Sequence, residues 1–232
     1  MRRLTPALKR RLVKLRRYEH HPIIHLVAKK HKISRRTLFY MKEYGSKSHI
    51  VSLIIKESMF SLILAFIIGT FAGISLESIG DSFFLILPLV ILFPAINDMI
   101  GDYSMIMVSR MSTLAFTKNL KGGWWEDRSV RKLIKTIFEV AVLSAFYISM
   151  LSSAIAYLKG YQLTTPAVFR ILQVSLLTTL VMVAIVVVLS SFAVFYIYKR
   201  REDPNNFVMP IMTSLADLGT ILTFGLFVSL IF

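Results

Sequence analysis

Five apolar stretches, each long enough to cross a bilayer, alternate with polar segments along the chain. They cover roughly residues 53–75, 83–116, 136–157, 169–197 and 207–232. The hydrocarbon core of a bilayer is about 30 Å thick, and a helix of about 20 apolar residues crosses it. A segment in lipid must satisfy its own backbone polar groups. The pattern therefore predicts an all-α polytopic membrane protein with five transmembrane helices.

The distribution of basic residues between these stretches predicts their orientation. The segment from 118 to 135 carries six Lys and Arg residues, and the segment before the fifth stretch carries Lys199, Arg200 and Arg201. The two alternate connections carry none and one. Because short loops rich in Lys and Arg stay on the cytoplasmic side, we expect the N-terminus inside the cell and the C-terminus outside. The expected location is the plasma membrane.

The formal charge of +15 belongs mostly to residues 1–50, which hold 15 of the 28 Lys and Arg residues and only two acidic ones. We expect a basic cytoplasmic arm of short amphipathic helices over 1–50 and a five-helix transmembrane domain over 51–232. Basic amphipathic segments bind anionic lipid, so membrane lipids are an expected partner. No recognition motif accompanies the charge, and nucleic acid is not expected.

The second stretch carries polar residues where lipid-facing helices have none. Asp98 and Asp102 are four residues apart and so share one helical face. We expect Ser109 and Ser112 to continue this face and Asn97 and Gly101 to lie beside it. An intramembrane carboxylate costs about 2.5–3.5 kcal/mol or more and is by default a candidate functional group. Pro88, Pro94 and Gly101 also predict a tilt, a kink or a break in this long stretch.

The fifth stretch repeats this theme. Thr213, Asp217 and Thr220 follow at helical spacing behind Pro210, and Asp217 falls near the middle of the stretch. No Lys or Arg lies within a helical turn of Asp217 in the sequence. If deprotonated, this carboxylate needs a cation from elsewhere.

Three further charged residues in or beside the apolar stretches have simpler interpretations. Glu139 follows Lys135 by four residues, which predicts an ion pair on a helix surface. Arg110 is a candidate structural partner of Asp102 or Glu57 across helices. Glu57 adjoins Lys56, so it is either part of a pathway or one half of a local pair.

Carboxylate, amide and hydroxyl oxygens suit hard cations such as Mg²⁺, Ca²⁺ and Mn²⁺. The chain has no cysteine and its five histidines precede residue 50, which argues against a zinc or copper site in the membrane. The candidate metal-binding residues are Asp217, Asp98, Asp102, Asn97 and Thr213. The candidate pathway or supporting residues are Gly101, Ser109, Arg110, Ser112, Pro210 and Glu57. We expect no enzymatic activity.

Two longer motifs lie in the second stretch and around the fifth. The first is PAINDMIGDYSMIMVSRMSTLA, where a Ser-Arg-x-Ser-Thr-x-Ala pattern begins at Ser109. The second is Asp-Pro-x-Asn from Asp203, followed by Pro210, Thr213 and Asp217. With these motifs the chain resembles the MgtE-type magnesium transporters and their eukaryotic solute-carrier relatives, over about residues 53–232. The Gly-Asn pair of the family is Gly101–Asp102 here.

This resemblance implies a homodimer that conducts a divalent cation along a path lined by the second and fifth helices of both subunits. It implies Mg²⁺ as the transported ion, with Mn²⁺, Co²⁺ and Ca²⁺ as alternatives. Asp217 would be the central carboxylate, acting on a largely hydrated ion. The alternative is a non-transporting membrane anchor that presents the basic arm to anionic lipid, nucleic acid or a partner protein. In an anchor the arm would be indispensable, and asparagine could replace the aspartates.

Overall fold

The structure is a computed structural model that describes residues 50–83, 86–118, 124–199 and 203–232. The expected arm lies outside the described residues. The helices are α4 (Ile50–Phe83), α5 (Leu87–Lys118), α6 (Arg128–Leu158), α7 (Thr165–Lys199) and α8 (Pro204–Ile231), with a short 3-10 helix η1 (Trp124–Glu126). The described part of the chain contains no strand. All five α-helices are long and apolar enough to cross a membrane, which confirms the predicted fold class.

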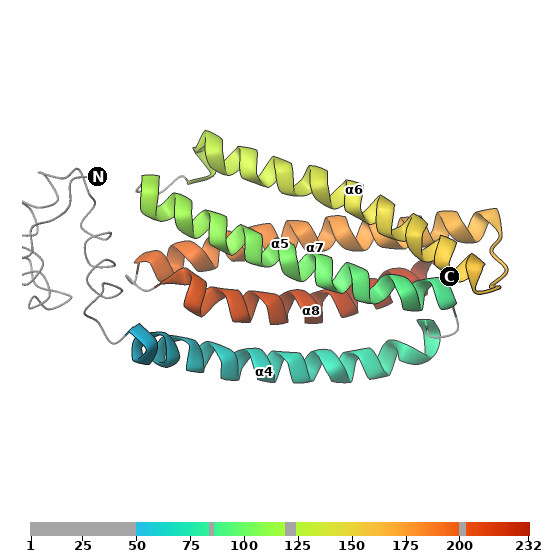
Figure 1. Cartoon of the computed structure of the whole chain (residues 1–232), viewed down its shortest axis with the longest axis horizontal. Helices are drawn as coiled ribbons and strands as arrows, with labels where there is room; N and C mark the ends of the chain where they lie inside the picture. Colours follow the sequence, from blue (N-terminus) through green and yellow to red (C-terminus); the bar gives the residue numbers. More distant parts are fainter. Residues whose placement is uncertain (1–49, 84–85, 119–123, 200–202) are drawn as a thin grey trace, which may run out of the picture.

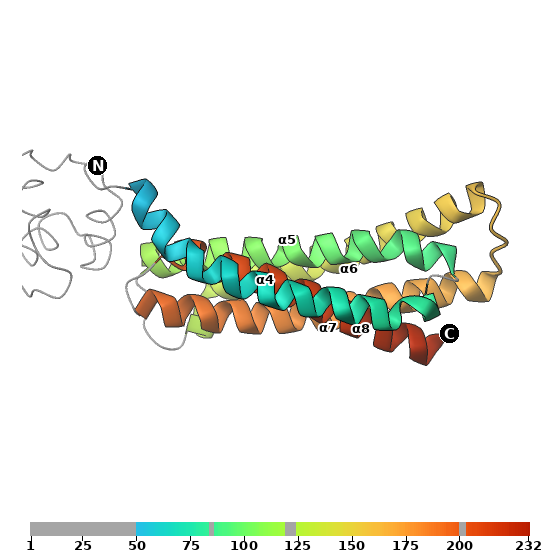
Figure 2. The same cartoon turned by 90° about the horizontal axis from the view of Figure 1, so that it is seen from below.

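The five α-helices lie side by side in an elongated bundle and alternate in direction (Figures 1 and 2). The helices α4, α6 and α8 begin at one end, which we call the arm end, and α5 and α7 begin at the other. The start of α4 and the C-terminus therefore lie at opposite ends of the bundle. This is the arrangement that an odd number of membrane crossings produces.

Most helices extend beyond the apolar stretches that predicted them. The connection expected between the first two apolar stretches, which end and begin at residues 75 and 83, is wrong, because α4 continues to Phe83. That segment contains no proline, and hydropathy marks only the lipid-facing part of a helix. At the arm end, α6 begins at Arg128 rather than near 136 because the Asp127 side chain caps it, accepting from the Ser129 N–H at 2.7 Å. Asp203 caps α8 in the same way, accepting from the Asn205 N–H at 2.9 Å.

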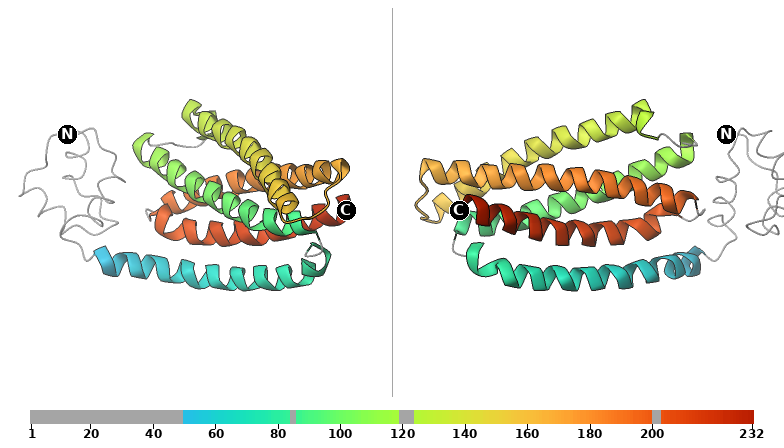
Figure 3. Two further views of the ribbon diagram at one scale, coloured as in Figure 1. Left: turned by 45° about the vertical axis from the view of Figure 1, so that its right-hand side comes forward. Right: turned by 180° about the vertical axis from the view of Figure 1, so that it is seen from behind.

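From Leu87 onwards the second stretch forms one uninterrupted helix, so the break that was among its expected distortions does not occur there. Pro88 lies in the first turn of α5, where its missing N–H costs no helical hydrogen bond. Pro94 is accommodated inside the helix. Figure 3 shows α5 crossing the bundle at an angle to α4.

The core lies where α5 packs against α6, α7 and α8. Leu92, Ile96 and Ile100 of α5 are fully buried there. The helix α4 lies at the edge of the bundle (Figure 3), where it packs chiefly against α8 and hardly touches α5. One face of α5 is consequently left uncovered between α4 and α6.

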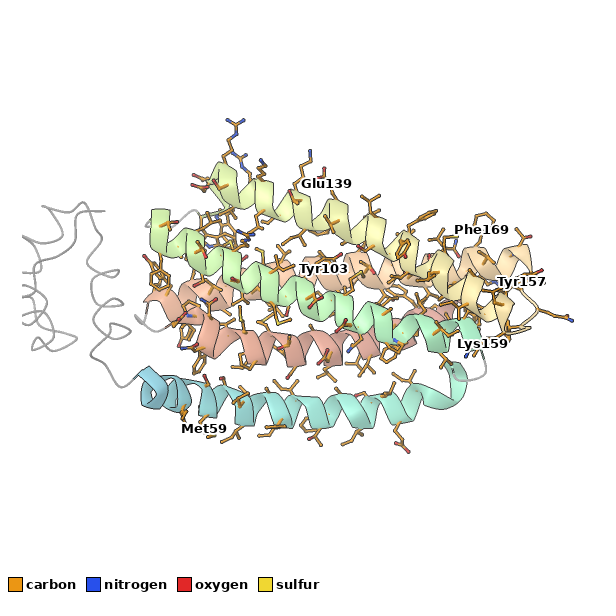
Figure 4. The ribbon with its side chains drawn as sticks, in the orientation of Figure 1. Met59, Tyr103, Glu139, Tyr157, Lys159 and Phe169 are labelled. Atoms are coloured by element: carbon orange, nitrogen blue, oxygen red, sulfur yellow. The ribbon has the colours of Figure 1, made fainter. Side chains whose placement is uncertain are left out.

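Away from the uncovered face of α5, the outer surface of the bundle is mostly apolar, as a bilayer requires. Phe66 of α4 is 75% exposed and Leu143 of α6 is 70% exposed. Met59 and Glu139 mark the outward sides of α4 and α6 in Figure 4. The expected surface ion pair is confirmed, since the Lys135 Nζ lies 3.4 Å from a Glu139 carboxylate oxygen.

The contact between α4 and α8 depends on Gly225. A Cβ at this position would lie 2.7 Å from both Cδ1 and Cγ2 of Ile79. We expect Gly225→Val to lower the stability of the bundle by about 1–3 kcal/mol through overpacking. Melting in detergent would measure this loss. Adding Ile79→Ala should restore most of it, whereas Gly69→Val, where no atom lies within 4 Å, should change little. An equal loss at both glycines would contradict this account.

Candidate cation pathway

Residues of α5 and α8 meet in register along an antiparallel contact that we call the α5–α8 seam. Its pairs, from the C-terminal end to the arm end, are Phe93 with Phe224, Asn97 with Asp217, Gly101 with Thr213, and Ser112 with Asn205. The numbers rise along α5 as they fall along α8. Three of these four pairs are polar or small, and an aromatic pair with ring centroids 5.2 Å apart closes the C-terminal end.

The closest polar contact in the seam joins Asn97 and Asp217. The Asn97 Nδ2 donates to the Asp217 Oδ1 at 2.9 Å. The Asn97 Oδ1 is buried and has no hydrogen-bond partner in the structure. Because a carboxylate only accepts, the amide nitrogen faces it and the amide oxygen is left for another donor or a cation.

Asp217 lies near the middle of α8. Asp217 is 13 residues after Pro204 and 14 before Ile231, which places it about 20 Å from the arm end at 1.5 Å per residue. A carboxylate and a free amide oxygen therefore share one location at mid-depth. Both are ligands that hard cations accept.

The next pair towards the arm end is Gly101 with Thr213. A Cβ at Gly101 would lie 3.9 Å from the Thr213 Cγ2, so the threonine methyl faces α5. The Thr213 hydroxyl donates back to its own helix, at 2.7 Å from the Met209 carbonyl and 3.2 Å from the Pro210 carbonyl. Its oxygen keeps lone pairs that can accept from water or bind a cation.

Asp98 and Asp102 lie on the uncovered face of α5. Both are exposed, as is Arg110 further along the same helix. In the described part of the chain no hydrogen bond joins either carboxylate to Asp217, and no ion pair joins Asp102 to Arg110. Asp102 and Arg110 are eight residues apart, or about 12 Å along the axis. Within the described part of one copy of the chain, these two carboxylates therefore form no hydrogen bond with the Asn97–Asp217 pair.

One expected residue has a different place from the one that the sequence indicated. Ser112 does not continue the face of Asp98 and Asp102, because it is buried and contacts Asn205 at 3.4 Å. Ser109 is half-buried beside it. The side chain of Glu57 lies outside the described residues.

Sequence reasoning missed two residues that touch this region, Asn205 and Ser61. Asn205 faces Ser112 across the seam, and its buried Oδ1 has no hydrogen-bond partner in the structure. Ser61 of α4 donates to the Asn206 carbonyl at 3.2 Å. The sequence held one signal for the Ser61 contact, which was Pro210. A proline leaves the carbonyl four residues earlier without its helical donor, so that carbonyl needs a donor from elsewhere.

Among the described residues, no three His, Cys, Asp or Glu side chains gather closely enough to hold a metal ion. The seam instead offers carboxylate, amide and hydroxyl oxygens in succession. Such oxygens can bind an ion through the water that it carries, and Mg²⁺ usually keeps several waters.

These features define a polytopic α-helical membrane protein with a carboxylate held at mid-depth between two of its helices. The sequence model of the MgtE family, described as a divalent cation transporter, matches residues 93–227, more than half of the chain. The chain belongs to this family, as its motifs indicated. No curated protein and no solved structure matches it.

The family match fixes the general activity as divalent cation transport across a membrane, which is not enzymatic. The matched range begins at Phe93 and ends at Phe227, so it contains both sides of the α5–α8 seam. The helix α4 and residues 1–49 precede the matched range.

Proposed function

We propose that this protein carries Mg²⁺ across the plasma membrane as a homodimer, through a path lined by α5 and α8 of both copies. The observation that carries this proposal is the contact between Asn97 and Asp217 at mid-depth, with a buried amide oxygen left without a partner. Uptake of Mg²⁺ by dye-loaded proteoliposomes tests it. We expect saturable uptake by the unmodified chain, and its absence would contradict the proposal.

The chemistry of the seam favours a hydrated ion. Water bound to a divalent cation is a strong hydrogen-bond donor, and the groups needed around it are acceptors. The free oxygen of Asp217, the amide oxygen of Asn97 and the hydroxyl oxygen of Thr213 are such acceptors. Mg²⁺ exchanges its water reluctantly, so it can pass these groups without being stripped. Mn²⁺, Co²⁺ and Ca²⁺ are the alternative ions.

The uncovered face of α5 supports a homodimer. Asp98 and Asp102 are exposed on a membrane-length helix, and each would cost about 2.5–3.5 kcal/mol or more if it faced lipid. A second copy related by a two-fold axis would cover this face with the same face of its own α5. The carboxylates of both copies would then line a shared, hydrated path.

The described basic residues support the arm end as the cytoplasmic end. Five exposed basic residues lie there: Arg128, Arg131, Lys132, Lys135 and Lys199. At the opposite end, Lys159 and Arg170 are exposed, and Figure 4 shows Lys159 close to the connection between α6 and α7. Basic residues near membrane-spanning helices favour the cytoplasmic side.

The absence of native cysteine makes this orientation directly measurable. Single cysteines in place of Glu126 and Lys159, which are both exposed and flank opposite ends of α6, provide a matched pair. In intact cells, we expect an impermeant maleimide to label the cysteine at 159 and to leave the cysteine at 126 unlabelled until the cells are opened. The reverse pattern would contradict the proposed orientation.

A further inference from the structure

Pro210 removes one backbone hydrogen bond from α8 two turns before Asp217. In an α-helix the N–H of each residue donates to the carbonyl four residues earlier. Proline has no N–H, and its ring also pushes that earlier carbonyl aside. At Pro210 the carbonyl concerned belongs to Asn206.

The hydroxyl of Ser61 offers a donor in place of the missing N–H, with its one proton shared between two carbonyl oxygens. The Ser61 Oγ lies 3.2 Å from the Asn206 carbonyl oxygen and 2.8 Å from the Ser58 carbonyl oxygen of its own helix. Ser61 is fully buried, although most residues around it on α4 are exposed. Asn206 is 145 residues away in the sequence, so the contact exists only through the packing of α4 on α8.

A second contact holds the two helices at the same level. The rings of Phe60 and Phe207 stack with centroids 5.9 Å apart and planes inclined by 20°. Each phenylalanine is the neighbour in sequence of a partner in the hydrogen bond. Adjacent residues of α4 and α8 thus join the helices by one polar and one aromatic contact.

We propose that Ser61 is a positioning residue for the cation path, acting through the Asn206 carbonyl on α8. Thr213 and Asp217 follow Pro210 by three and seven residues, so they share its helical face. The direction of α8 at Pro210 therefore decides how both residues meet Gly101 and Asn97 of α5. Ser61 fixes that direction against α4. This inference rests on the proposed function, in which Asp217 meets the cation.

The inference gives α4 a role in transport, although α4 precedes the range that matches the family. The residue that completes the hydrogen bonding of α8 comes from the helix that joins the bundle to residues 1–49. A displacement of α4 at the arm end would therefore act on Asp217 through the Pro210 segment.

A double-mutant cycle in the full-length protein tests this inference, with Mg²⁺ uptake and melting temperature as readouts. We expect Ser61→Ala to raise the Mg²⁺ concentration for half-maximal uptake by about three- to tenfold, a loss in the range of one hydrogen bond. A merely structural defect would instead lower the maximal rate per protein and leave half-saturation unchanged. Ser75→Ala is the matched control, because the Ser75 hydroxyl donates within α4 to Phe71, and it should change neither value.

The second arm of the cycle replaces Pro210 with alanine. Residue 210 then carries an N–H that can donate to the Asn206 carbonyl, and Ser61 becomes redundant. In this background Ser61→Ala should leave half-saturation and melting temperature within error of Pro210→Ala alone, whatever effect Pro210→Ala has by itself. This non-additivity is the signature of a shared contact.

Additive effects of the two substitutions, or unchanged half-saturation in Ser61→Ala, would overturn the inference while uptake by the unmodified protein continued. Failure of the proposed function would differ, because the unmodified protein itself would then take up no Mg²⁺. The positioning role would then be wrong as well. The melting temperatures of the double-mutant cycle would still show whether Ser61 and Pro210 act on the same carbonyl.

Discussion

Asp217→Asn should strongly lower Mg²⁺ uptake while the bundle stays folded. Asparagine keeps the size of the side chain, and its amide oxygen can still accept from the Asn97 Nδ2 that now donates at 2.9 Å. The change therefore removes one negative charge from mid-depth and little else. We expect the rate at low Mg²⁺ to fall by at least about tenfold, which corresponds to about 1.4 kcal/mol of lost stabilisation. Flux into dye-loaded proteoliposomes measures the fall.

Glu139→Gln is the control for this experiment, because Glu139 is a carboxylate on the outer surface of α6, paired with Lys135. Its neutralisation should leave uptake unchanged. Size-exclusion chromatography and melting should be the same for all three proteins. Equal uptake by Asp217→Asn and the unmodified chain would show that Asp217 is not part of the path. Asp98 and Asp102 would then be the candidate cation-binding residues.

Neutralising Asp98 and Asp102 together should have the second largest effect. Both lie on the uncovered face of α5, where a homodimer would bring two copies of each towards a shared axis. We expect Asp98→Asn with Asp102→Asn to raise the half-saturating Mg²⁺ concentration by about tenfold. The maximal rate should fall less, because Asp217 remains. The measurement is uptake as a function of Mg²⁺ concentration.

Ionic strength and a control carboxylate sharpen this second test. Added monovalent salt should shrink the difference between the double variant and the unmodified chain, since salt screens charges that face water. Glu77→Gln on α4, another exposed carboxylate, should not change half-saturation. An unchanged half-saturation in the double variant, or an equal change in Glu77→Gln, would contradict a pathway along this face.

The sequence predicted the membrane helices well because their signal is local. Hydropathy detects each apolar stretch without reference to the others, and the spacing of Lys135 and Glu139 was enough for their ion pair. The helix ends were less accurate. Asp127 and Asp203 begin α6 and α8 before the apolar residues start, and capping depends on side-chain geometry that hydropathy does not measure.

The site was harder to predict because its contacts join distant segments. Asn97 and Asp98 are adjacent, so their side chains leave the helix about 100° apart. Only the packing of α5 decides that Asn97 faces Asp217 and that Asp98 faces outwards. The Asn97–Asp217 contact spans 120 residues. Periodicity could place polar residues on a helical face, but it could not state which neighbour that face meets.

The measurement that tests the central claim most directly is ion flux through the unmodified, full-length protein. The purified chain would be reconstituted into liposomes loaded with a Mg²⁺-sensitive dye, and the same vesicles would be tested with Mn²⁺, Co²⁺ and Ca²⁺ and with sodium or proton gradients. We expect saturable entry of Mg²⁺ that protein-free vesicles do not show. The absence of flux of all four ions under every gradient would contradict the account and would favour a membrane anchor that presents the basic arm.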